Sequence, residues 1–157
     1  MELKEFMIKE GVKRKYILDT SIVFKWYHQE NEDNVDKAIY FYEQLNENKI
    51  IIISPGLMCY ELLNGFRSKL EIHEDVIDEI IKEIYDILFI VNLDRILFKK
   101  AFTISRAINQ SFYDSVFIAL SEELNALLVT ADQRLYKNAR DNDYNVILLS
   151  DFDEHYF

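Results

Sequence analysis

The chain has 157 residues, of which 50% are hydrophobic and 14% aromatic, so it can bury one sizeable core and has the length of a single domain. Its 18 Lys and Arg against 28 Asp and Glu give a formal charge of −10, which argues against a general nucleic-acid coat protein, because affinity for phosphate backbones comes mainly from cations. The lone Cys59 excludes an internal disulfide and suits the cytoplasm, and no run of residues is apolar and long enough for a signal peptide or a membrane span.

Short apolar runs alternate with stretches of helical periodicity along the chain. In chain order, the pattern predicts a strand at 16–19, helices at 22–28 and 35–45, a strand at 50–53, helices at 57–70 and 73–88, a strand at 89–91, helices at 94–108 and 112–124, a strand at 126–130, a helix at 132–140 and a strand at 146–149. The run at 50–53 is four isoleucines, typical of a buried strand. Ser54 and Pro55 follow it and are typical of the cap and first turn of a helix.

Strands that are apolar on both faces and alternate with helices indicate a parallel sheet covered on both sides. We therefore predict an α/β fold, a three-layer Rossmann-like sandwich whose central sheet has about five strands in the order 3-2-1-4-5. One domain is expected to span residues 1–157, with 1–14 and 151–157 peripheral. Phe152, Tyr156 and Phe157 could dock the tail on the body or on a partner.

Acidic residues fall where such a sheet binds ligands, at the carboxyl ends of its strands. Asp19 closes the first strand, and Asp132 lies two residues past Thr130 at the end of the fourth. Glu61 stands among apolar neighbours early in the helix after the second strand, and Asp114 is the only charge between residues 110 and 120. Acids in apolar surroundings are costly unless something neutralises them, and a hard cation such as Mg²⁺ does so with oxygen ligands.

Each acid also has an ordinary structural interpretation. Asp19 and Asp132 could cap helices, Asp114 could favour the first turn of its helix, and Glu61 could face solvent. Because four acids from four separate elements fall at one edge of the predicted sheet, the sequence favours a shared site.

Four stretches of this chain resemble the PIN-domain nucleases, and more narrowly the VapC-type toxins of toxin–antitoxin pairs. They are YILDTS at 16–21, SP at 54–55 continuing to YELLN at 60–64, YDSVFIAL at 113–120 continuing into 121–123, and LVTAD at 128–132 with Arg134 and Leu135. Together with the last strand they span residues 16–149. The helix carrying Asp114, followed by LVTAD, is the specific part of this likeness.

The resemblance implies a PIN-like fold and Mg²⁺- or Mn²⁺-dependent hydrolysis of RNA phosphodiester bonds. It implies that Asp19, Glu61, Asp114 and Asp132 are both the catalytic residues and the metal ligands. One or two ions held by these acids would lower the pKa of a bound water and stabilise the leaving oxygen. Thr20 and Thr130 match positions where the family often has a hydroxyl that supports a ligand, although each could equally be a capping residue. A protein antitoxin and a homodimer are further expectations. The apolar helix at 96–108 could form the homodimer, although an apolar stripe on a helix more often belongs to the core.

Contacts to RNA are less specific. Arg134 and Lys137, with Arg140, lie on the helix after Asp132 and could reach flanking phosphates, although a solvated face is the alternative. Trp26 and Tyr27 could stack on bases but are more typical of a core. The three histidines, His28, His73 and His155, lie outside the motifs, and we expect them at the surface.

Other α/β enzymes that handle phosphate fit poorly. A haloacid-dehalogenase phosphatase needs an acid at position 21, which is Ser; a receiver domain needs a lysine after the fifth strand; a P-loop enzyme needs a glycine-rich cradle that three scattered glycines cannot form. Two alternatives stay open: a PIN-like binding or scaffold module without catalysis, and a solitary RNA-processing nuclease.

Overall fold

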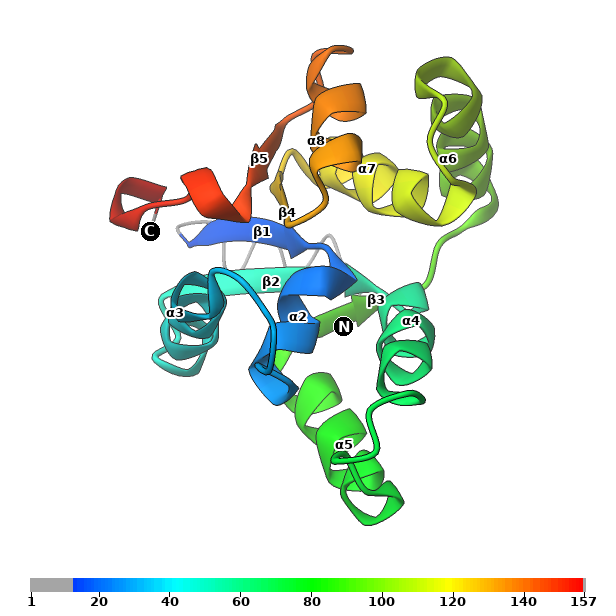
Figure 1. Cartoon of the computed structure of the whole chain (residues 1–157). Helices are drawn as coiled ribbons and strands as arrows, with labels where there is room; N and C mark the ends of the chain where they lie inside the picture. Colours follow the sequence, from blue (N-terminus) through cyan, green and yellow to red (C-terminus); the bar gives the residue numbers. More distant parts are fainter. Residues whose placement is uncertain (1–12, 157) are drawn as a thin grey trace.

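The structure, a computed structural model, describes residues 13–156. Its centre is a five-stranded parallel sheet in the order β3-β2-β1-β4-β5, which confirms the predicted topology (Figure 1). The strands are β1 (Arg14–Leu18), β2 (Ile50–Pro55), β3 (Phe89–Val91), β4 (Leu127–Thr130) and β5 (Val146–Leu148). The order in which strands are added to the sheet changes direction between β1 and β4, which are parallel neighbours. The carboxyl ends of these two strands therefore form the crevice where such sheets bind ligands.

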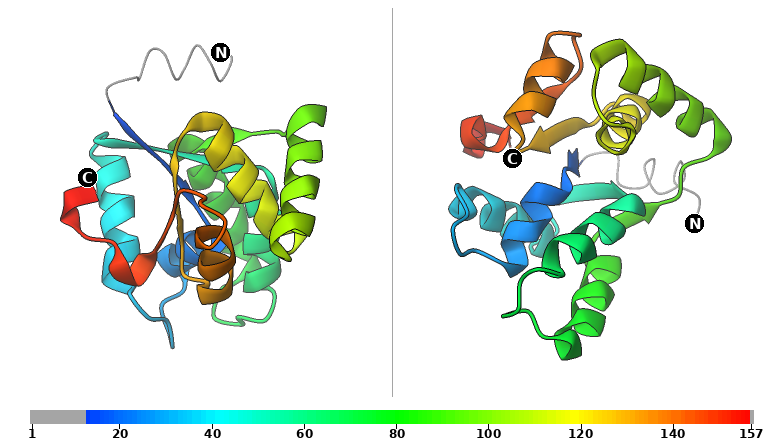
Figure 2. Two further views of the ribbon diagram at one scale, coloured as in Figure 1. Left: turned by 90° about the horizontal axis from the view of Figure 1, so that it is seen from above. Right: turned by 45° about the vertical axis from the view of Figure 1, so that its right-hand side comes forward.

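Helices cover both faces of the sheet. They are α2 (Thr20–Tyr27), α3 (Val35–Asn46), α4 (Leu57–Phe66), α5 (Ile77–Ile87), α6 (Arg95–Ile108), α7 (Phe112–Leu124) and α8 (Gln133–Arg140), with short 3₁₀ turns η1 (Glu74–Val76), η2 (Leu149–Asp151) and η3 (Glu154–Tyr156). α3 and α7 lie on opposite sides of the sheet, and α6 packs along α7 (Figures 1 and 2). Within residues 13–156, no helix combines the length and apolarity that a membrane crossing needs.

The junction between β2 and α4 differs from the sequence prediction. Ser54 and Pro55 do not begin the helix; they are the last residues of β2 and pair with Ile90 and Val91 of β3. Pro55 has no N–H to donate to a neighbouring strand. The pairing of β2 with β1 already ends at Ile53, so β1 does not need that donor. The helix therefore starts at Leu57 and ends at Phe66, four residues before the predicted end.

The carboxyl-terminal tail is anchored by one aromatic side chain. Phe152 is 2% exposed, and its ring lies 4.3 Å from that of Phe41 and 5.8 Å from that of Tyr16, measured between centroids. The expected docking of Phe152 is thus confirmed. Phe157 and residues 1–12 lie outside the described residues.

Candidate active site

The four acids lie where the sequence predicted, at the carboxyl ends of the strands or in the helices beside them. Asp19 directly follows β1, and Asp132 is the second residue after β4. Glu61 is the fifth residue of α4, and Asp114 is in the first turn of α7. Asp19 is buried, Glu61 and Asp114 are half-buried, and Asp132 is exposed.

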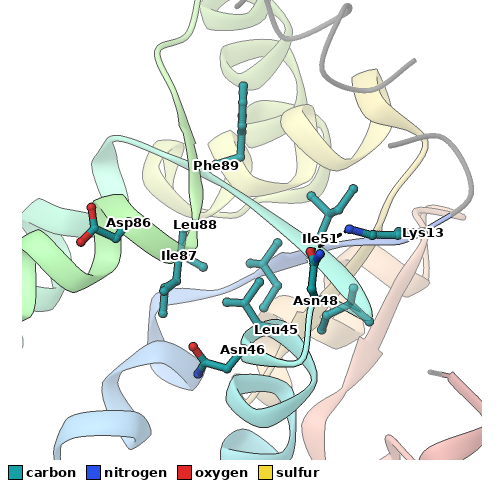
Figure 3. A pocket seen from close by; sticks show the side chains of 11 residues that line it. Lys13, Leu45, Asn46, Asn48, Ile51, Asp86, Ile87, Leu88 and Phe89 are labelled. Atoms are coloured by element: carbon teal, nitrogen blue, oxygen red, sulfur yellow. Dashed lines mark hydrogen bonds between the residues drawn. The ribbon is translucent and has the colours of Figure 1, made fainter. Parts of the chain in front are cut away.

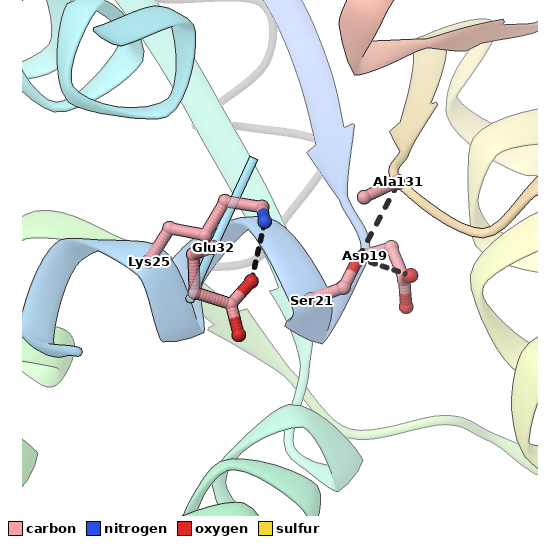
Figure 4. Close-up of polar contacts among 5 residues, drawn as sticks. All are labelled: Asp19, Ser21, Lys25, Glu32 and Ala131. Carbon is pink, nitrogen blue, oxygen red and sulfur yellow. Dashed lines mark hydrogen bonds and ion pairs between the residues drawn. The ribbon is translucent and has the colours of Figure 1, made fainter. Parts of the chain in front are cut away.

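Asp19 is held by two hydroxyl groups. Ser21 Oγ donates to its Oδ2 at 2.7 Å (Figure 4). Thr130 Oγ1 donates to the same Oδ2 at 2.9 Å, and Asp19 N donates to Val129 O at 2.9 Å. Burial raises the pKa of the Asp19 carboxyl; the two hydroxyl hydrogen bonds lower it, and the charge of Asp114 raises it further. The two hydroxyl groups therefore fix this carboxylate in place, and no basic side chain within residues 13–156 forms an ion pair with it.

Glu61 is joined to the end of β1 through a neighbouring threonine. Thr20 Oγ1 donates to Glu61 Oε1 at 3.0 Å. Burial is the main cause that raises the pKa of Glu61 to about 7, and the charges of Asp19 and Asp114 raise it as well. The solvent-facing interpretation of Glu61 does not hold, because the residue is half-buried and its carboxyl accepts a hydrogen bond from Thr20.

Asp114 is oriented by two residues that precede its helix. Ser111 Oγ and Gln110 Nε2 donate to its Oδ2, at 2.7 and 2.8 Å, and Asp114 N donates back to Ser111 Oγ at 3.0 Å. Asn138 Nδ2 on α8 donates to Gln110 Oε1 at 2.9 Å, so α8 is linked to Asp114 through Gln110. These bonds all leave Oδ1 available.

Asp132 caps α8, as its ordinary structural interpretation expected. Its Oδ1 accepts hydrogen bonds from Arg134 N at 2.8 Å and Leu135 N at 3.0 Å. Its own N–H donates to Thr130 Oγ1 at 3.0 Å, and the same hydroxyl donates to Asp19. Thr130, the last residue of β4, therefore connects Asp19 at the end of β1 to Asp132, the N-cap of α8.

Three of the four acids thus influence one another electrostatically, while Asp132 is tied to them through Thr130. A tighter group exists elsewhere in the described chain: His28, Glu30 and Glu71 each offer a ligand atom, and all three atoms lie within 4.8 Å of one another. The acid site is a looser set of oxygen donors. Such a set fits Mg²⁺, which is usually bound through one or two carboxylates and keeps several waters.

The expectation that all three histidines are at the surface is wrong for His28. It follows α2, is only 5% exposed, and its ring packs against Phe24 with 5.3 Å between centroids. Its Nε2 lies 2.5 Å from Glu71 Oε1, and its buried Nδ1 has no hydrogen-bond partner among the described residues. His73 and His155 are exposed, as expected.

The side chains predicted to contact RNA bond to other groups of the protein in this structure. Arg134 donates to the backbone oxygen of Asn109 at 3.5 Å, and Lys137 pairs with Asp141 at 3.1 Å. Trp26 is 9% exposed and donates to Ala38 O, and Tyr27 donates to Glu83 Oε2, so both rings belong to the body of the fold.

Sequence reasoning missed four side chains that orient the acids: Ser21 beside Asp19, and Ser111, Gln110 and Asn138 beside Asp114. Ser21 could have been noticed, since it stands two residues after the acid. Nothing in the sequence signals a contact between Gln110 and Asn138, because 28 positions separate them.

The open end of the sheet must be distinguished from a hollow at the other end. A cavity of about 400 Å³ is lined by residues that include Lys13, Asn48 and Phe89, with Lys13 Nζ donating to Asn48 Oδ1 at 2.7 Å (Figure 3). Lys13 precedes β1 and Phe89 begins β3, so this cavity lies at the amino ends of the strands. It is remote from the acids, which all lie toward the carboxyl ends.

Comparisons with known structures support the same fold. The chain is similar to FitAB bound to the IR36 DNA fragment, with a TM-score of 0.67 at 13% identity over 89% of this chain and 99% of that one. It is also similar to Mycobacterium tuberculosis VapC20, described as a sarcin-ricin loop cleaving toxin, with a TM-score of 0.59 at 11% identity over 82% and 95%. It is similar as well to VapBC2 from Rickettsia felis bound to a promoter DNA fragment, with a TM-score of 0.56 at 16% identity over 85% of this chain and 96% of that one.

Comparison with curated proteins gives no match. The model of the PIN domain family matches residues 16–141, a stretch that contains the last three residues of β1, all of β2 to β4, α8 and all four acids. This match covers most of the chain, and the sheet order and the placement of the acids agree with it. The chain therefore belongs to the PIN domain family.

Proposed function

We propose that this protein is a metal-dependent endoribonuclease and the toxin of a toxin–antitoxin pair. The observation that carries the proposal is the burial of Asp19 and Glu61 at the carboxyl edge of the sheet, near Asp114: burial first, and the charges of the neighbouring acids second, raise the pKa values of Asp19 and Glu61. Ionised acids that are close together and partly buried destabilise the fold unless a positive charge compensates them, and a bound divalent cation supplies that charge. PIN domains are generally nucleases, which favours hydrolysis as the use of such a site.

Asp19, Glu61, Asp114 and Asp132 would hold Mg²⁺ or Mn²⁺. When bound, such an ion supplies Lewis-acid chemistry, lowering the pKa of water and offsetting the negative charge that develops in phosphodiester hydrolysis. Ser21 and Thr130 keep Asp19 oriented, and Ser111 and Gln110 keep Asp114 oriented, so the ligands need little rearrangement.

The similar structures bear on the substrate and the partner. VapC20 cleaves the sarcin-ricin loop by its description, which favours RNA as the substrate here. FitAB and VapBC2 are described as bound to DNA, VapBC2 to a fragment of its promoter, and the resemblance of this chain to VapC-type toxins favours a protein antitoxin here. An antitoxin peptide could cover the acid site by placing an Arg among the carboxylates.

The test is Mg²⁺- or Mn²⁺-dependent cleavage of structured and single-stranded RNAs by the purified protein, with EDTA as the metal-free reference. The Asp114→Asn protein should remain folded and lose cleavage. Glu71→Gln is the matched control, because it alters an acid of the tight group with His28 and Glu30 but none of the four. Cleavage that persists in EDTA, or that depends on Glu71 and not on Asp114, would contradict the proposal.

The antitoxin has its own test. A small protein encoded beside this gene should form a stable complex with the chain on co-expression and should inhibit cleavage. An adjacent product that binds without inhibiting cleavage would contradict the toxin assignment and favour a solitary nuclease.

A further inference from the structure

A small polar pocket lies beside the acid site, on the β4 and β5 side. It has a volume of about 210 Å³, and Ala131 and Gln133, the two neighbours of Asp132, contribute to its wall. A further wall comes from Lys25 of α2 and from the loop between α2 and α3, and the lining is completed at the end of β5; these residues are Asn31, Glu32, Asp33, Asn34, Leu148, Leu149 and Ser150.

The loop that forms this wall is fixed by a buried ion pair. Lys25 is 5% exposed, and its Nζ donates to Glu32 Oε2 at 2.5 Å (Figure 4). Asn31 and Asn34 adopt left-handed backbone conformations, with φ of 59° and 53°, which asparagine tolerates better than most other residues. This ion pair favours one shape of the pocket wall, which lowers the entropic cost of binding a ligand.

Three side-chain amides around the pocket have unused hydrogen-bonding capacity. Those of Asn31, Asn34 and Gln133 make no hydrogen bond with any other residue that the structure describes. Each amide offers both donors and an acceptor. Asn34 precedes α3 at its cap position, yet its side chain does not cap the helix.

We propose that this pocket receives one nucleobase of the RNA, next to the scissile phosphate, and that its three amides make the cleavage sequence-selective. The inference rests on the proposed function. The charge of Lys25 is compensated by Glu32, so the pocket has no free cation for a phosphate. No aromatic ring lines it, so recognition would use the hydrogen-bonding edge of the base instead of stacking.

The first test compares cleavage preferences on an RNA library with randomised sequence. Asn31→Gly and Asn34→Gly remove the amides while permitting the left-handed backbone, and Gln133→Ala removes the third amide. Each should reduce the preference for the favoured base roughly twofold to tenfold, the factor that one hydrogen bond contributes. Asn125→Gly is the matched control, since Asn125 also has positive φ, at 48°, but follows α7 and precedes β4 at the opposite end of the sheet.

Unchanged base preferences in all three variants would overturn the inference and leave the proposed function intact. A second measurement does not need cleavage: side-chain amide NMR signals of the ¹⁵N-labelled Asp114→Asn protein, titrated in Mg²⁺ with short oligoribonucleotides that differ at one base. The signals of Asn31, Asn34 and Gln133 should move with one base and less with the others, while that of Asn125 stays. If none of the oligoribonucleotides moves them, the inference is wrong, whether or not the wild-type protein cleaves RNA.

Discussion

The hydroxyl of Thr130 donates to Asp19 Oδ2 at 2.9 Å and accepts from Asp132 N at 3.0 Å, so a single fully buried side chain connects two of the four acids. This contact joins residues that are 111 positions apart. It exists because β1 and β4 are neighbours in the sheet and end at the same edge.

Replacing Thr130 with Val should therefore be costly. Valine preserves the β-branched shape but leaves Asp132 N without its partner and removes one of the two hydroxyl groups on Asp19, so the free energy of unfolding should fall by about 1–3 kcal/mol. Urea denaturation measures this. Thr130→Ser should lose less, and Thr103→Val on α6, where the exposed hydroxyl contacts only Lys99 O, is the control. Equal losses at positions 103 and 130 would contradict the bridging role.

Glu61→Gln should change how stability depends on pH. The pKa of Glu61 is about 7 in the folded protein, against 4.5 for an ordinary glutamate, so its protonated form favours folding. That contribution is fully present below about pH 4.5 and is lost as pH rises through about 7. Without divalent cations, Glu61→Gln should therefore raise the melting temperature at pH 8 and change it little at pH 5.

Added Mg²⁺ should reverse this order. The cation stabilises the ionised carboxylates of the wild type, so the advantage of the Gln variant at pH 8 should shrink as Mg²⁺ is titrated. A Glu61→Gln protein that is less stable than the wild type at pH 8 in EDTA would show that burial and the charges of Asp19 and Asp114 do not destabilise the ionised carboxyl of Glu61.

The tail should contribute substantially to stability. Phe152→Ala removes a ring packed against Tyr16 and Phe41, and should lower the free energy of unfolding by about 3–5 kcal/mol. Tyr156→Ala is the control, because Tyr156 stacks on Phe152 but is 36% exposed. If the two variants unfold at the same urea concentration, Phe152 does not anchor the tail.

Most of the fold could be predicted because apolar runs and helical periodicity leave few alternatives for which segments form strands and which form helices. The α7 sequence is buried from Ser115 to Ser121, and its bounds match the prediction. The β2 to α4 junction could not be predicted in the same way. Ser54 and Pro55 suit a helix start locally, but β3 pairs with them, and this pairing is decided by a strand about 35 residues further along the chain.

The acids could be located from the sequence because strand ends and first turns of helices fix their positions along the chain. Their partners could not, with the exceptions of Thr20 and Thr130, which stand next to motif positions. The burial of His28 was missed because the residue follows the last turn of α2, and the acid it meets, Glu71, comes from the segment after α4.

The homodimer prediction can be tested on the surface formed by α6 and its neighbours. Ile96 and Phe98 are 72% and 51% exposed, and Tyr60 and Tyr113, which precede Glu61 and Asp114, are 78% and 59% exposed. Phe98, Tyr60 and Tyr113 line one hollow of about 320 Å³. Clustered apolar side chains of this kind are typical of an interface.

Phe98→Asp should therefore shift the protein from dimer to monomer in light scattering, because it places a charge in a surface that must lose its water on association. Tyr85→Asp is the matched control, since Tyr85 is 58% exposed on α5 and is not among the residues lining that hollow. The surface also adjoins Glu61 and Asp114 through their aromatic neighbours, so loss of the dimer should reduce RNA cleavage more than Tyr85→Asp does. A Phe98→Asp protein with the same mass in solution as the wild type would show that this surface does not form the dimer.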